Sequence, residues 1–110
     1  MAEVPLEALA WARSGDKGDA ANIGVLARDP AFLPWIWAAL TPAIVAERFE
    51  GLAFGPVERF PMPGIDGLNL LLHGALGGGG MASLRWDPQG KAYAQRLLSL
   101  KITIPERLAP

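Results

Sequence analysis

Three dipeptides, each a capping side chain followed by proline, divide the chain and limit what it can fold into. They are Asp29-Pro30, Thr41-Pro42 and Asp87-Pro88. An Asp or Thr side chain accepts hydrogen bonds from the free N–H groups of a first helical turn, and proline fits the first helical position. The apolar periodicity behind these dipeptides predicts amphipathic helices over about 30–40, 42–52 and 88–99.

Five apolar or alternating runs lie around these helices and predict strands. Their ranges are 4–12, 21–28, 57–62, 67–73 and 100–104. Pro61 argues for an edge position of the third run, because proline cannot donate to a sheet ladder. The continuous apolar run 67–73 favours an interior strand. We therefore predict an α+β fold with a mainly antiparallel sheet of four or five strands and three helices on one face.

The composition indicates one domain over 1–110 that is partly covered by another chain. Hydrophobic residues make up 51% and charged residues 19% of the sequence. The hydrophobic share is high and the charged share is low for a free-standing domain. The net charge of −1, with scattered basic residues, argues against nucleic acid as a partner. There is no cysteine, no signal-peptide pattern and no apolar run long enough for a membrane span. We expect a soluble cytoplasmic protein with no membrane partner.

The densest polar cluster is the segment 13–19, which we expect to be a loop between two strands. It reads Arg-Ser-Gly-Asp-Lys-Gly-Asp and is followed by Asn22. Its cations could hold a carboxylate or phosphate, and its carboxylates could act as a base, bind a metal or orient the cations. The alternative is a turn whose charges pair among themselves in solvent. If the loop is functional, its residues gather at one end of the sheet, with Asn69 and His73 within reach. The candidate ligand-binding residues are Arg13, Ser14, Asp16, Lys17, Asp19, Asn22, Asn69 and His73.

That segment, with Ala-Asn-Ile-Gly-Val at 21–25, resembles the opening of the C-terminal domain of AtuA-like proteins, the acyclic terpene utilisation family. Further similar stretches are 63–69, the glycine-rich run 74–80, Ser83-Leu84-Arg85 and 87–91. The resemblance implies a ferredoxin-like two-layer sandwich. It also implies a link to breakdown of acyclic terpenes and related acyl compounds. In longer relatives this domain follows a much larger N-terminal domain, and we expect this chain to be a stand-alone form of the smaller domain.

Two further features leave alternatives open. The four glycines 77–80 could form an anion-binding nest, or be a flexible turn or a close contact with another chain. They match neither a Walker loop nor a dinucleotide fingerprint, so no cofactor is expected. His73, the only histidine, could shuttle protons or be structural. A single histidine without cysteine argues against a zinc site.

The first helix indicates a partner surface. Successive helical residues turn by about 100°, so Trp35 falls away from the core direction set by Leu33, Ile36 and Leu40. We expect Trp35 either to anchor an interface or to be covered by its own chain. An interface there would belong to a homo-oligomer or to a complex with an AtuA-like large subunit.

These observations favour an accessory subunit of a separately encoded AtuA-like large subunit. The alternatives are a small enzyme for an acyl or hydroxyacyl substrate, using segment 13–19 with His73, and a module that binds a small carboxylate. No nucleophile elbow surrounds Ser14 or Ser83, so a Ser-His-Asp triad has no sequence support.

Overall fold

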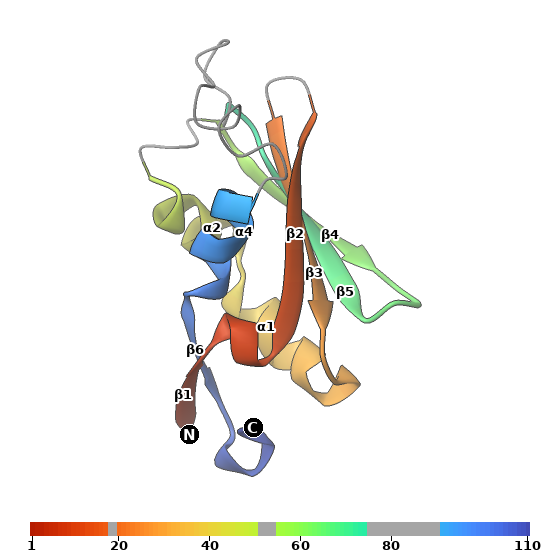
Figure 1. Ribbon diagram of the computed structural model, residues 1–110, viewed down its shortest axis with the longest axis vertical. Coiled ribbons are helices and arrows are strands. Elements are labelled where there is room, and N and C mark those ends of the chain that lie inside the picture. Colours follow the sequence, from red (N-terminus) through yellow and green to blue (C-terminus); the bar gives the residue numbers. More distant parts are fainter. Residues whose placement is uncertain (18–19, 51–54, 75–90) are drawn as a thin grey trace.

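A computed structural model of the protein describes residues 1–17, 20–50, 55–74 and 91–110. In these residues the chain forms an α+β arrangement of two antiparallel sheets and three α-helices (Figure 1). The main sheet has the order β2-β3-β5-β4, and β1 pairs with β6 in a separate two-stranded sheet. The strands are β1 (Ala2–Pro5), β2 (Ala10–Lys17), β3 (Ala20–Ala27), β4 (Val57–Met62), β5 (Gly67–Leu72) and β6 (Lys101–Ile104). The helices are α1 (Leu33–Ala39), α2 (Pro42–Arg48) and α4 (Lys91–Leu98), with short 3-10 turns η1 (Leu6–Ala8), η2 (Pro30–Phe32) and η4 (Glu106–Leu108).

Two of the predicted helix caps are confirmed. The Asp29 carboxylate accepts a hydrogen bond from Ala31 N at 2.8 Å and starts η2, which continues into α1. The Thr41 hydroxyl accepts one from Ile44 N at 3.2 Å, with Pro42 at the first position of α2. The third predicted cap, Asp87-Pro88, lies outside the described residues, as do the glycines 77–80. Helix α2 ends at Arg48, earlier than the predicted 52.

The prediction of one strand over 4–12 is wrong. The 3-10 turn η1 interrupts it, so β1 and β2 belong to different sheets. Leu6 and Leu9 are both fully buried, and Leu9 N donates to Leu6 O at 2.8 Å. Two apolar residues three positions apart therefore face the core through a tight turn, where strand alternation would have turned them to opposite faces. The last strand, β6, pairs with β1 and not with the main sheet.

The prediction of a loop over 13–19 is also wrong for most of its length. Strand β2 continues to Lys17 and β3 begins at Ala20, with cross-strand pairs from Ala10↔Ala27 to Lys17↔Ala20. Polar residues are compatible with a strand when one face of the sheet meets solvent. The other strand predictions are confirmed: β4 is an edge strand over the predicted 57–62, and β5 is interior.

The helices and the core lie on one face of the main sheet. Helix α4 contacts β2 and α2 contacts β4. Alternate residues of the central strands are fully buried beneath the helices, among them Ile23, Leu68, Leu70 and Leu72. Phe49, the residue that follows α2, packs against Tyr93 of α4 with ring centroids 5.5 Å apart. No described helix alone has the length and apolar composition of a membrane span; Pro30–Ala39 and Pro42–Arg48 reach it only together, as a pair bent by 73°.

The expectation that Trp35 points away from the core is wrong. Trp35 is only partly exposed and packs against the core cluster of its own chain, on a helix that contacts β6. Of the two outcomes expected for Trp35, this is the one in which its own chain covers the side chain. Among the residues that the structure describes, the exposed large apolar side chains lie elsewhere: Met1, Trp11, Leu26, Ile44, Phe60 and Ile65.

Two sets of arginine contacts fix the helices. Arg48 Nε donates to Arg96 O at 2.9 Å and Arg96 Nε donates to Arg48 O at 3.0 Å, which joins α2 to α4. Arg59 of β4 donates through Nη1 to the carbonyls of Trp37 at 2.5 Å and Leu40 at 3.1 Å, at the C-terminal end of α1. Its guanidinium also lies 3.6 Å from the Trp37 ring centroid. A cation at a helix C-terminus is favourable because unpaired carbonyls gather there.

We expect Arg59→Met to lower the free energy of unfolding by roughly 1–3 kcal/mol, because it removes two charge-assisted hydrogen bonds and the stacking on Trp37. Urea denaturation measures this change. Arg107→Met, at an exposed position in η4, is the matched control and should change stability by less than about 0.5 kcal/mol. Equal effects of the two substitutions would contradict a special role for Arg59.

Candidate functional site

The face of the main sheet opposite the helices carries several of the predicted site residues. Register pairs place Trp11, Leu26, Gly67 and Met62 in one row across the four strands, and Arg13, Gly24, Asn69 and Phe60 in the next. A third row holds Gly15, Asn22, Leu71 and Glu58. Residues that are paired in register point to the same side of a sheet. We call these three rows the open face.

The open face brings three predicted residues together. Asn22 Nδ2 donates to Asn69 Oδ1 at 3.4 Å, so a side-chain contact joins β3 to β5. Arg13 lies opposite Gly24, which in turn lies opposite Asn69. The Arg13 side chain is exposed and has no hydrogen-bond or ion-pair partner among the residues that the structure describes. It is therefore available to an incoming carboxylate or carbonyl.

The other predicted residues do not join this group. Ser14 faces the core, is 6% exposed, and its hydroxyl has no hydrogen-bond partner in the described part of the chain. The backbones of Asp16 and Lys17 pair with Ala21 and Ala20, while Asp19 lies outside the described residues. The prediction of one polar cluster fails for Ser14 because alternate strand residues point to opposite faces.

His73 pairs with an acidic side chain on the neighbouring strand. Its Nε2 lies 2.7 Å from Glu58 Oε1, and the two side chains are 37% and 47% exposed. Main-chain hydrogen bonds from His73 N to Pro56 O and from Gly55 N to His73 O extend the β4–β5 pairing to this point. Ser14 faces the opposite side of the sheet, so these residues form no Ser-His pair. Among the described residues no three acidic or histidine side chains cluster as a metal site would require.

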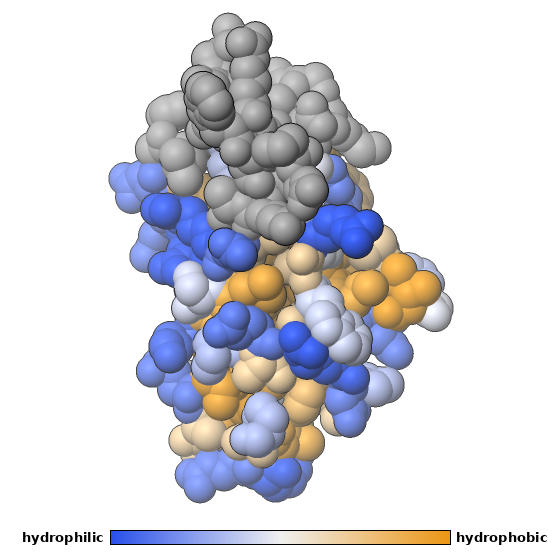
Figure 2. Space-filling view, viewed as in Figure 1, coloured by the Kyte–Doolittle hydropathy of each residue, from blue (hydrophilic) through white to orange (hydrophobic). Residues whose placement is uncertain are grey.

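Exposed aromatic side chains on the open face were not among the predicted site residues. Trp11 is 53% exposed and Phe60 43% exposed. The guanidinium of Arg28 lies 4.6 Å from the Trp11 ring centroid, and Arg28 Nε donates to Glu7 O at 3.0 Å. Because Arg28 is held by that carbonyl, it fixes the indole on the surface. Hydrophobic side chains also gather over the β4–β5 hairpin (Figure 2).

Two glycines of the open face are there for different reasons. A Cβ on Gly67 would lie 2.5 Å from Val25 O, so the packing of β5 against β3 requires glycine. A Cβ on Gly24 would lie 3.9 Å from its nearest neighbour, Arg13 O, which is an ordinary contact. The fold therefore does not require glycine at position 24. Its effect is to leave a flat area between Arg13 and Asn69.

Comparison with known families agrees with this architecture. A family model for the AtuA ferredoxin-like domain matches residues 4–103, nearly the whole chain. Comparison with curated proteins and with solved structures gave no match.

We expect Gly67→Ala to destabilise the protein by about 1–3 kcal/mol or more, because the added methyl group overlaps a main-chain carbonyl. Gly24→Ala should leave the free energy of unfolding unchanged or raise it by up to about 1 kcal/mol, because alanine restricts the unfolded chain and causes no clash in the folded one. Thermal and urea unfolding of both variants measure the difference. A stable Gly67→Ala protein would contradict the close approach of β5 to β3.

Proposed function

Because the chain belongs to the AtuA ferredoxin-like domain family, we propose that it is an accessory subunit whose open face binds a separately encoded AtuA-like large subunit. The complex would act in the breakdown of acyl or terpenoid compounds. The observation that carries this proposal is a sheet face without covering helices in the described structure, which exposes Trp11 and Phe60. Exposed aromatic residues on one surface favour a protein interface.

The chemistry of the open face supports a protein partner. Tryptophan and arginine are enriched among the residues that contribute most to binding, and Trp11 and Arg13 are both exposed on β2. The flat area at Gly24 lets a partner's backbone or ring approach the sheet closely. The amide groups of Asn22 and Asn69 offer further donors and acceptors beside it.

Binding of a small carboxylate is a second candidate for the same face. It is supported by the exposed guanidinium of Arg13, which can hold a carboxylate through two parallel hydrogen bonds. The amide of Asn69, across Gly24, could donate a further bond. The enzyme alternative has no such support: Ser14 and His73 lie apart, and His73 is paired with Glu58.

We expect the tagged protein, purified from its native host, to bring down an AtuA-like large subunit identified by mass spectrometry. Gly24→Val should fold normally, because the position faces solvent, and yet lose most of the partner, because the side chain fills the flat area. Trp11→Ala should weaken capture about thirtyfold, the loss expected for a central interface residue. Thr103→Val introduces the same β-branched side chain at an exposed position on β6; it is the control and should retain the partner.

The outcomes separate the candidates. If the unchanged protein captures only further copies of this chain, and Gly24→Val loses that capture, the partner at this face would be a second copy of the chain and not a large subunit. Full capture by both open-face variants would contradict the proposed surface. Recovery of a small carboxylate without any protein, lost in Arg13→Gln, would favour the second candidate.

A further inference from the structure

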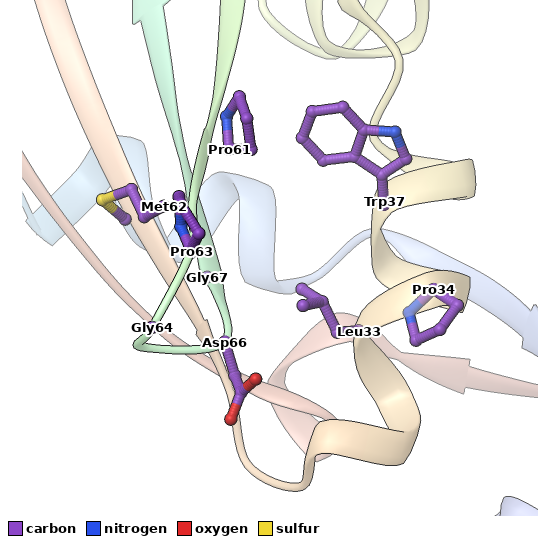
Figure 3. Close-up of a pocket in the computed structure, with 9 residues that line it drawn as sticks. All are labelled: Leu33, Pro34, Trp37, Pro61, Met62, Pro63, Gly64, Asp66 and Gly67. Carbon is purple, nitrogen blue, oxygen red and sulfur yellow. The ribbon is translucent and has the colours of Figure 1, made fainter.

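A groove lies between α1 and the β4–β5 hairpin and borders the open face at Met62 and Gly67. Its volume is about 370 Å³, and it is lined by Leu33, Pro34, Trp37, Pro61, Met62, Pro63, Gly64, Asp66 and Gly67 (Figure 3). Ligand pockets in proteins span about 300–1,000 Å³, so this groove suits a small ligand. The Trp37 indole extends toward Pro61 at one end, and the Asp66 carboxylate lies at the other.

The turn that forms this groove has a fixed backbone. Gly64 has φ 93° and Asp66 φ 52°, both in the left-handed region. Asp66 O accepts a hydrogen bond from Ala27 N at 2.9 Å, which attaches the hairpin to the end of β3. At the other side, Arg59 holds the C-terminal end of α1 through the Trp37 and Leu40 carbonyls. The two walls of the groove are therefore both tied to the main sheet.

The lining has one charged group. Asp66 is acidic, and the remaining lining residues are apolar or glycine. The Asp66 carboxylate has no hydrogen-bond or ion-pair partner among the described residues. A single carboxylate at one end of an apolar groove complements a ligand with a cationic head and an apolar stem. It disfavours a ligand with a carboxylate head, because like charges repel.

We propose that this groove is a binding site for small aliphatic amines. The ammonium group pairs with the Asp66 carboxylate, and the alkyl stem lies against Leu33, Pro61 and Pro63 as far as Trp37. This site does not use the open-face residues Trp11, Arg13 and Gly24, so it stands whether or not the chain binds a large subunit.

The test titrates the isolated protein with hexylamine, hexan-1-ol or hexanoate at equal ionic strength. Two-dimensional ¹H–¹⁵N NMR spectra follow the amides of Gly64, Asp66 and Gly67 and the indole N–H of Trp37. Hexylamine should shift these signals with the lowest Kd of the three probes, in the millimolar range, and hexanoate should bind most weakly. Equal or tighter binding of hexanoate, or shifts confined to other residues, would overturn the proposal.

A charge-removing variant isolates the role of the carboxylate. Asp66→Asn keeps the shape of the side chain, and asparagine also accepts positive φ. It should raise the Kd for hexylamine about three- to fivefold, as expected for an exposed ion pair, and leave that for hexan-1-ol unchanged. Glu47→Gln, an exposed carboxylate on α2, is the matched control and should change neither value. An unchanged hexylamine Kd in Asp66→Asn would also overturn the proposal. If that variant does not fold, the ranking of the three probes on the unchanged protein decides.

Discussion

The antiparallel pairing of β3 with β5 is the contact on which the rest of the structure depends. These two interior strands supply Ile23, Leu68 and Leu70 to one face, where the helices cover them. Strand alternation then assigns the intervening residues to the other face, whatever their polarity. The close approach of the strands at Gly67, where a Cβ would meet Val25 O at 2.5 Å, allows little change in register. Both the core and the open face follow from this one pairing.

The edges of the sheet carry the connections to the helix layer. On β4, Arg59 reaches from a strand to the end of α1 and satisfies carbonyls that a short helix leaves unpaired. Within the helix layer itself, the reciprocal bonds of Arg48 and Arg96 join α2 and α4. Long arginine side chains therefore fix the position of α1 relative to β4 and of α2 relative to α4, in addition to the apolar packing between these elements. Pro61 on β4 also removes a donor from an exposed edge, which limits further strand addition there.

The two proposed surfaces differ in chemistry because they lie on different parts of the fold. The open face combines exposed aromatic rings with Arg13 and paired asparagines, a mixture suited to a large, partly polar partner. The groove beside α1 is small and apolar and has one carboxylate, which suits a small cationic ligand. The groove shares Met62 and Gly67 with the open face, but its other lining residues belong to the hairpin turn, the helix side of β4 and α1. A protein bound around Arg13 and Gly24 could therefore still leave the groove accessible.

The residues that carry the resemblance divide between the two faces of the sheet. Arg13, Asn22 and Gly24 lie on the open face, and Ser14 lies in the core. A contiguous polar segment in a sequence therefore need not form one site, because neighbouring residues in a strand point in opposite directions. Alternation also explains why the sequence did not predict an exposed Trp11. A strand was predicted there, but the sequence does not say which face of that strand the helices cover.

Local rules in the sequence determined the features that depend on near neighbours. These are the caps at Asp29 and Thr41, the edge position of the strand with Pro61, and the interior apolar strand at 67–72. Tertiary structure decided what depends on distant segments. It separated β1 and β6 into their own sheet, turned Leu6 and Leu9 to the same core, and buried part of Trp35. Residues 13–17 became strand because their partners at 20–24 supply a hydrogen-bond ladder that the segment lacks by itself. Side-chain patterns report only on the local chain, whereas strand pairing and burial are set by whichever segments pack together.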